Sequence, residues 1–320
     1  VQQAGRRSVV YAAQLALVAS AIVVGVTPSA GVSAADGFAD VIVTGDGDGD
    51  GVCAPAVDDP LASAGTVECT TLRSALSAAA PGAEIEVPAG TYTLTEGPLS
   101  VSTAGVRIVG ARRPVPADGI NPGDATLIDA GGSQAFIVNA PNVEIAGVAV
   151  TGVVTSGKVD GAVEVKAKAD GFTLSDATIV GNEASSGAGV AVDKGATGIL
   201  IERSTFVGNV ASGKGGGLRV DGSASIVNST FTDNSAQSGG AISVAGTAAI
   251  SFSTFVDNTS NNSKGGGVDR NGGDLYITGS ILTQALQSGS DGSDCSGTPD
   301  LVGVNYVGND QGCNPVSYTH

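Results

Sequence analysis

The chain has 320 residues, of which 49 are glycine, 42% are hydrophobic and only 4% are aromatic, so Val, Ile, Leu and Ala must build its core. Its formal net charge of -16 argues against binding to nucleic acid or to an anionic membrane through bulk charge. The only histidine is His320, which leaves almost no place for a histidine base, a histidine metal ligand or a Ser-His-Asp triad.

Residues 1–34 have the layout of a secretory signal peptide. Arg6 and Arg7 precede an apolar run at residues 9–26, and a small-x-small cleavage pattern follows at residues 32–34. The alternative is an uncleaved anchor helix, since the apolar run just reaches the length that spans a bilayer. We expect cleavage, with an exported protein that is extracellular or at the cell surface and has no membrane span after signal removal.

An acidic loop region, residues 35–67, is expected next. Asp46, Asp48 and Asp50 have the D-x-D-x-D-G spacing that calcium loops use, because alternate carboxylates converge on one hard cation. The bidentate acid that completes such a loop is missing, since Val57 stands at its position. Two interpretations stay open, a Ca2+ site at the three aspartates or a solvated acidic turn. No other cofactor is indicated.

A short amphipathic helix is expected within residues 70–80, before Pro81-Gly82. Its apolar face consists of Leu72, Ala75, Leu76 and Ala79. A helix here would cap the first coil of the fold described next, which otherwise presents an open interior and unpaired strand edges. Short strand-like runs follow it, interrupted by an expected loop at residues 112–124.

The middle of the chain repeats, with four aligned segments at residues 172–182, 199–209, 224–234 and 249–258. A period of this length suits one coil of a β-solenoid. Two columns of the alignment are apolar: Leu174, Ile201, Ile226 and Ile250, and Ile179, Phe206, Phe231 and Phe255. A Gly-rich step then leads to a third set of apolar residues, Val190, Leu218, Ile242 and Val268, with Val163 as an earlier member. We predict an all-β fold, a single-stranded right-handed parallel β-helix over residues 68–288 with a short N-terminal capping helix.

Each repeat ends in an asparagine, namely Asn182, Asn209, Asn234 and Asn258. An amide offers two donors and an acceptor, so amides stacked at strand spacing can bond to the ones above and below. The alternative is a polar ligand site, but the repetition favours a structural ladder. Two of these asparagines follow Asp233 and Asp257, which could form an acid/base pair. Gly181 and Gly208 stand at the equivalent places, which favours a tight-turn role instead.

The four cysteines allow three disulfide pairings, and the β-helix selects one of them. Roughly eight coils at about 4.8 Å separate the two ends, so only local pairs are within reach. We predict Cys53–Cys69 and Cys295–Cys313, the second closing a C-terminal segment at residues 289–320. Disulfides fit an exported chain.

Three stretches resemble known families. CTTLRSAL (69–76), followed by EVPAGTYTL (86–94), resembles the CSLREA motif region of secreted bacterial parallel β-helix proteins, with one extra Thr after the Cys and Ser74 where Glu is usual. The Phe-x-x-Asn segments and GGAI (239–242) are similar to the repeats of polymorphic outer-membrane proteins. Residues 293–313 are similar to the Cys-bounded segment that closes many such β-helices. The resemblance implies a right-handed parallel β-helix at the cell surface or secreted, and no particular activity.

The leading functional hypothesis is a non-catalytic exported β-helix, a structural or adhesion-type module that binds an extracellular protein or glycan. The alternative is a polysaccharide lyase or glycoside hydrolase, because this fold hosts many of them. Such an enzyme needs clustered acids with Arg or Lys on one strand face and aromatic platforms for sugar. The sequence shows neither, with no Trp and scattered basic residues. An inhibitor or immunity-type module has no supporting feature.

Overall fold

The structure is a computed structural model that describes residues 40–56, 66–111, 125–155, 160–262, 264–283, 293–310 and 312–313. All of them belong to one compact unit, Phe38–His320. The expected signal peptide (residues 1–34) and the expected loop at residues 112–124 lie outside the described residues. Within the described ranges, no helix combines the length and the apolar character needed to cross a membrane.

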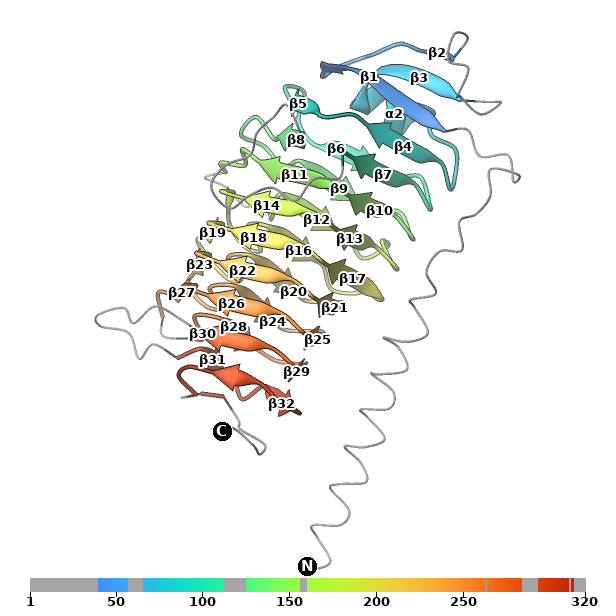
Figure 1. The fold of residues 1–320 in the computed structure, drawn as a ribbon. Helices are drawn as coiled ribbons and strands as arrows, with labels where there is room; N and C mark the ends of the chain where they lie inside the picture. Colours follow the sequence, from blue (N-terminus) through green and yellow to red (C-terminus); the bar gives the residue numbers. More distant parts are fainter. Residues whose placement is uncertain are drawn as a thin grey trace, which may run out of the picture. The chain divides into compact units, whose positions relative to one another are not determined.

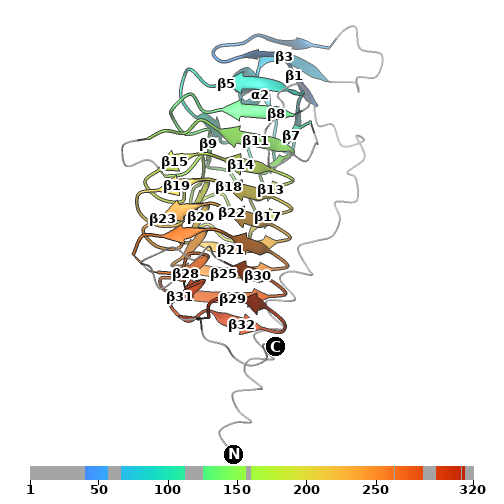
Figure 2. The ribbon, with the colours of Figure 1, turned by 60° about the vertical axis from the view of Figure 1, so that its left-hand side comes forward.

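The described residues form an all-β parallel solenoid of about nine turns (Figure 1). Four sheets run along it, which we call A, B, C and D, and their strands pair in parallel except for the β2–β3 pair. A typical coil places one strand in sheet A, one in sheet B, a short one in sheet D and one in sheet C. Figure 2 shows β15, β19 and β23 of sheet D stacked beside β14, β18 and β22 of sheet B.

The strand bounds follow this order. Sheet A contains β1 (Val41–Gly47), β2 (Cys53–Pro55), β3 (Val67–Thr71), β4 (Glu84–Val87), β7 (Arg107–Gly110), β10 (Glu144–Ala146), β13 (Thr173–Ser175), β17 (Ile199–Glu202), β21 (Ser223–Val227), β25 (Thr247–Ser251), β29 (Asp274–Thr278) and β32 (Asp300–Val302). Sheet B contains β5 (Gly90–Thr93), β8 (Thr126–Asp129), β11 (Val148–Thr151), β14 (Thr178–Val180), β18 (Thr205–Val207), β22 (Thr230–Thr232), β26 (Thr254–Val256), β30 (Ile281–Thr283) and β33 (Tyr306–Val307). Sheet C contains β6 (Leu99–Val101), β9 (Phe136–Val138), β12 (Val163–Val165), β16 (Val190–Val192), β20 (Leu218–Val220), β24 (Ile242–Val244), β28 (Val268–Arg270) and β31 (Cys295–Ser296). Sheet D contains β15 (Glu183–Ala184), β19 (Val210–Ala211), β23 (Ser235–Ala236) and β27 (Thr259–Ser260).

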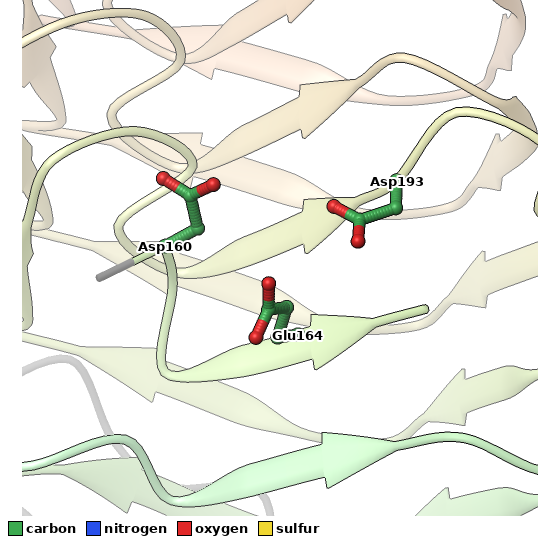
Figure 3. A group of neighbouring side chains, drawn as sticks. All are labelled: Asp160, Glu164 and Asp193. Atoms are coloured by element: carbon green, nitrogen blue, oxygen red, sulfur yellow. The ribbon is translucent and has the colours of Figure 1, made fainter. Parts of the chain in front are cut away.

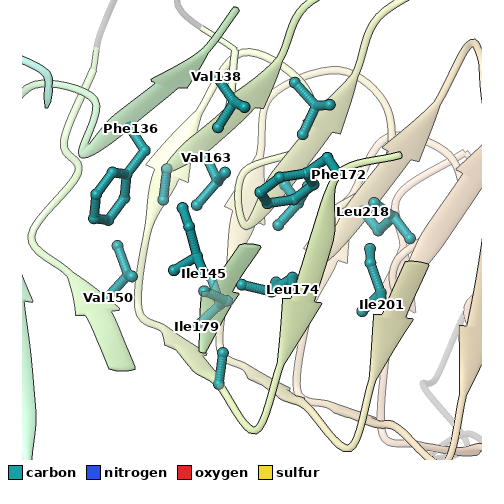
Figure 4. Packing of buried hydrophobic residues seen from close by; sticks show 14 of the residues in the cluster. Phe136, Val138, Ile145, Val150, Val163, Phe172, Leu174, Ile179, Ile201 and Leu218 are labelled. Atoms are coloured by element: carbon teal, nitrogen blue, oxygen red, sulfur yellow. The ribbon is translucent and has the colours of Figure 1, made fainter. Parts of the chain in front are cut away.

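The core consists of columns of like residues, as the repeat predicts (Figure 4). Leu174, Ile201, Ile226 and Ile250 pair in register within sheet A. Ile179, Phe206, Phe231 and Phe255 do so within sheet B. The apolar residues after each Gly-rich step form the third column, in sheet C: Val163, Val190, Leu218, Ile242 and Val268. Every one of these side chains is buried.

The Gly-rich step is a packing requirement as well as a turn. A Cβ at Gly217 would lie 2.9 Å from the Phe231 ring and 3.0 Å from the Ala241 carbonyl. A side chain at Gly217 would therefore have to displace the Phe231 ring or the neighbouring backbone, so this coil needs glycine here, although the next coil has Ala241 at the equivalent position.

The expected helix is α2 (Leu72–Ala78), which packs against β1, β3, β4 and β6 at the first turns. Thr71 caps it, since its side chain accepts a hydrogen bond from the Ser74 backbone. The Ser74 hydroxyl accepts one in return from the Thr71 backbone at 3.3 Å. Ser74 therefore completes the capping box that a glutamate usually completes.

The solenoid is longer than the predicted range of residues 68–288. β1 pairs with β4, so sheet A already begins inside the expected acidic loop region of residues 35–67. β31, β32 and β33 continue the sheets inside the expected C-terminal segment of residues 289–320. These outer coils carry no regular repeat, and their strands were therefore not recognisable from periodicity.

Asp233 and Asp257 have φ values of 56° and 55°, and Gly181 and Gly208 have 63° and 61° at the equivalent places. All four therefore occupy the left-handed turn between sheets B and D, a conformation that glycine and aspartate tolerate better than most residues. The predicted tight-turn role matches this backbone.

Candidate functional site

The four repeat asparagines lie one above another in the turn that leaves sheet B, and all are buried. The side-chain amide of Asn182 donates to Asn209 Oδ1 at 3.0 Å, that of Asn209 to Asn234 at 2.9 Å, and that of Asn234 to Asn258 at 2.9 Å. The backbone N–H of each of the first three asparagines donates to the same oxygen. We call this array the asparagine ladder. Its polar groups are occupied by one another, which leaves them unsuited to binding a ligand.

A second ladder, at the corner between sheets A and B, was not foreseen. It consists of the buried residues Ser204, Ser229, Ser253 and Ser280. Each hydroxyl accepts the backbone N–H of the residue in the preceding coil, at 3.1–3.3 Å. It donates to the carbonyl two residues earlier in its own coil. The signal was present in the sequence, because a serine stands two residues before each of the three stacked phenylalanines.

The disulfides of the structure are Cys53–Cys69 and Cys295–Cys313, the two local pairs. Cys53 and Cys69 stand opposite one another in the antiparallel β2–β3 pair. Cys295 continues the sheet C column above Val268. Each bond therefore joins elements at one end of the solenoid.

Asp46, Asp48 and Asp50 do not converge on a common point. The Asp48 side chain is 2% exposed and accepts from Arg73 Nε at 2.8 Å and from Arg73 Nη2 at 3.1 Å. The backbone N–H groups of Thr95 and Glu96 donate to it at 2.7 and 2.8 Å. Burial by itself raises the pKa of Asp48, but these hydrogen bonds outweigh it and hold the pKa below its ordinary value.

Asp48 therefore makes a structural contact, which neither the Ca2+ interpretation nor the solvated-turn interpretation included. Asp46 belongs to strand β1, an extended segment and not a loop, and both Asp46 and Asp50 are exposed. Asp48 instead ties this region to α2 through Arg73. The described residues contain one group of acidic side chains close enough to share a metal ion, and none of these three aspartates belongs to it.

That group consists of Asp160, Glu164 and Asp193, on the outer face of sheet C (Figure 3). Asp160 precedes β12, Glu164 is the middle residue of β12, and Asp193 follows β16 in the next coil. One oxygen from each carboxylate lies within 4.8 Å of the others. We call the three residues the acidic cluster.

Two basic side chains lie against the acidic cluster. Arg219 bonds to Asp160 at 2.7 Å and to Asp193 at 3.2 Å. Lys166 bonds to Glu164 and lies 3.6 Å from Asp193. Burial lowers the pKa of Arg219, but the carboxylates of Asp160, Asp221 and Asp193 together outweigh it, so the pKa is raised. The cations thus link three successive coils.

The remaining carboxylate oxygens of the cluster also have protein partners. Ser185 donates to Asp160 Oδ1 at 2.7 Å, and Gln134 donates to Glu164 Oε2 at 3.1 Å. Counted together with the contacts of Lys166 and Arg219, all six oxygens of the cluster meet a donor or a cation. A structural network of partly buried polar groups requires a hydrogen-bond or ionic partner for each oxygen, and the acidic cluster meets this requirement.

Two properties of the acidic cluster are nevertheless compatible with catalysis or with metal binding. Burial, followed by the negative charges of Glu164 and Asp160, raises the pKa of Asp193, although Lys166 and Arg219 oppose the shift. A carboxyl with a raised pKa beside ionised carboxylates is the arrangement of a general acid in glycoside hydrolysis. The same oxygens have the hardness and spacing for Ca2+ or Mg2+, but a metal ion would have to displace Lys166 and Arg219.

Sequence reasoning missed the acidic cluster and described the basic residues as scattered. Lys166 and Arg219 are 53 positions apart by number, yet they lie two coils apart on one strand face. The signal was the outward position beside each apolar residue of the sheet C column. Glu164 follows Val163 and Arg219 follows Leu218, so aligning the coils by these apolar residues brings them together.

Comparison with known proteins supports the repeat and names no activity. The family described as Chlamydia polymorphic membrane protein (Chlamydia_PMP) repeat matches residues 228–245, which contain Phe231, Asn234 and the GGAI step. No curated protein matches the chain. No solved structure matches it either. The match covers less than one full coil of the solenoid, and it makes this chain similar to surface-type β-helix repeat proteins.

Proposed function

We propose that the chain is an exported β-helix of the cell surface or extracellular space, which binds an extracellular protein or glycan and catalyses no reaction. The observation that carries the proposal is the complete pairing of the acidic cluster, since an acid/base pair needs carboxylates that can reach a substrate. The polymorphic membrane protein repeat, the two disulfides and the resemblance of residues 69–94 to CSLREA proteins support export.

The test of export is to express the full chain with its own N-terminus in a bacterial host, separate the fractions and label intact cells with an antibody. The proposal expects labelling of intact cells or protein in the medium, with both disulfides formed. Retention of the chain in the cytoplasm with reduced cysteines would contradict it.

A glycan-cleaving enzyme remains the second candidate, favoured by the raised pKa of Asp193 within the acidic cluster. Pectins, alginates and neutral glycans should be incubated with the protein, with and without Ca2+, and new reducing ends or unsaturated products measured. The non-catalytic proposal expects no turnover. The matched variants are Asp193→Asn inside the cluster and Asp221→Asn, which touches Arg219 but lies outside it. Turnover that Asp193→Asn abolishes and Asp221→Asn retains would establish the enzyme.

A further inference from the structure

The turn that joins β28 of sheet C to β29 of sheet A consists of Asn271, Gly272 and Gly273. It contains the only Asn-Gly pair in the sequence. All three residues are exposed. The amide carbon of an asparagine side chain can be attacked by the backbone nitrogen of the next residue, most readily when that residue is glycine and has no Cβ in the way. The turn therefore has the two groups that such a reaction needs.

The reacting groups are not held by hydrogen bonds. The side-chain amide of Asn271 and the backbone N–H of Gly272 form no hydrogen bond to any described residue. The backbone N–H of Asn271 is bonded to the Val244 carbonyl at 2.7 Å. A Cβ at Gly272 would have the Ala245 carbonyl oxygen, at 3.4 Å, as its nearest neighbour, so the space around this glycine is open. The Asn271 side chain can therefore rotate toward Gly272 without breaking a contact.

An earlier coil has an asparagine at the same position. Asn139 follows β9 of sheet C as Asn271 follows β28, and its backbone N–H bonds to the Val101 carbonyl of the preceding coil at 2.9 Å. It is also exposed, and its amide also forms no hydrogen bond to a described residue. The residue after it is Ala140, which has a Cβ and is only 2% exposed. Asn139 is therefore a matched comparison for Asn271 within the same protein.

We propose that Asn271 is a site of spontaneous deamidation through a cyclic imide. The Gly272 nitrogen, after losing its proton, attacks Asn271 Cγ, so that an N–Cγ bond forms, the Cγ–Nδ2 bond breaks and ammonia leaves with a proton. Water then opens the ring at one of its two carbonyl carbons. Attack at Cγ gives aspartate, and attack at the main-chain carbonyl carbon gives isoaspartate, in which the main chain runs through Cβ and Cγ. In sum, an amide and water become a carboxylate and ammonium.

The two products differ in how they fit the fold. Aspartate is compatible with it, because Asp193 and Asp221 hold the same position in their coils, each with its backbone N–H bonded to the preceding coil. Isoaspartate adds a methylene group to the main chain between β28 and β29. A Cβ at Gly273 would lie only 1.7 Å from the Gly246 carbonyl oxygen, so the turn is closely packed just before β29. The longer main chain should therefore displace the start of β29 from β25.

The experiment incubates the full chain in mildly alkaline buffer, which favours loss of the amide proton, and maps its peptides by mass spectrometry over time. Enzymatic methylation detects isoaspartate. Asn271 should convert to a mixture of aspartate and isoaspartate. When half of Asn271 has converted, Asn139 should still be almost entirely in the amide form. The Asn271→Gln variant, which would have to form a larger ring, should keep its amide over the same period; circular dichroism shows that each sample stays folded.

Three outcomes would overturn the proposal. The first is an intact Asn271 in the folded protein, and the second is conversion of Asn139 at the same rate, because exposure alone would then explain the reaction. The third is formation of aspartate without isoaspartate, since direct hydrolysis of the amide gives aspartate alone.

Urea unfolding tests the consequence for the fold. The isoaspartate form should have a lower midpoint than the wild type, whereas Asn271→Asp, which adds the same charge without lengthening the main chain, should stay close to the wild type. Equal midpoints for the isoaspartate form and Asn271→Asp would refute the displacement of β29. None of these outcomes bears on export or on glycan cleavage.

Discussion

Removing one rung of the asparagine ladder should destabilise the protein more than removing any charged surface residue. In Asn234→Ala, two donors lose their acceptor, namely the backbone N–H and the side-chain N–H of Asn209, which lie 3.1 and 2.9 Å from Asn234 Oδ1. Asn258 Oδ1 loses its side-chain donor at 2.9 Å, and the Phe206 carbonyl loses the amide at 3.0 Å.

The expected loss of stability follows from the number of donors that lose their acceptor. A buried group without its partner costs about 1–3 kcal/mol, so two stranded donors predict a loss of about 2–6 kcal/mol. Ser229→Ala strands one donor, the Ser204 backbone N–H, and should cost about 1–3 kcal/mol. Arg203 pairs with Asp176 at 2.9 Å on the surface, and Arg203→Ala should cost less than about 1 kcal/mol. The left-handed backbone at Arg203 does not alter this, since Ala and Arg meet the same restriction there.

The three variants should be compared by urea unfolding followed by far-ultraviolet circular dichroism. The slope of the transition should stay constant while the midpoint falls most for Asn234→Ala, less for Ser229→Ala and least for Arg203→Ala. Equal midpoints for Asn234→Ala and Arg203→Ala would refute the ladder as a source of stability.

Three further outcomes are expected. The folded-state pKa of Asp48 is lowered, so the stability that this carboxylate contributes is complete above its ordinary pKa of 3.8 and is lost as the pH falls through the lowered pKa. In acid unfolding, the Asp48→Asn variant should lack this loss of stability, and the control Asp50→Asn should keep it. Phe231→Ala opens a cavity between two stacked rings and should cost about 3–5 kcal/mol in chemical denaturation. Peptide mapping without reductant should join Cys295 to Cys313, and replacing both by serine should cost about 3 kcal/mol.

The architecture was predictable because the same types of buried residue recur in each regular coil. Phe206, Phe231 and Phe255 recur at the coil period, and recurrence identifies both the coil and the side of the strand that faces inward. Asn234 and its equivalents were predictable for the same reason, since a ladder requires the same group at every level. The phenylalanine column and the asparagine ladder are both visible in the sequence because they belong to the repeat itself.

The acidic cluster and the acidic loop were not predictable on that basis. Asp160 and Glu164 have no like residue in the adjacent coil and Asp193 recurs only as Asp221, so no column identifies the cluster. The contact of Asp48 was missed for another reason, because its local spacing left a Ca2+ site and a solvated turn open while its partner, Arg73, is 25 residues away. Non-repeating contacts on the outside of a solenoid become visible only when the coils are aligned by their apolar residues and the outward positions are then compared.

The ladders and the disulfides lie in different parts of the solenoid, the ladders in the regular central coils and the disulfides at the two ends. A coil in a solenoid contacts only its neighbours, so a terminal coil has a partner on one side alone. The asparagine ladder begins at Asn182 and ends at Asn258, within the regular coils, where each amide has an equivalent in at least one adjacent coil. Cys53–Cys69 and Cys295–Cys313 lie beyond those limits, where the repeat fails. Hydrogen-bonded stacking thus holds the centre of the solenoid, and covalent bonds restrict the unfolded chain at the two ends where stacking cannot.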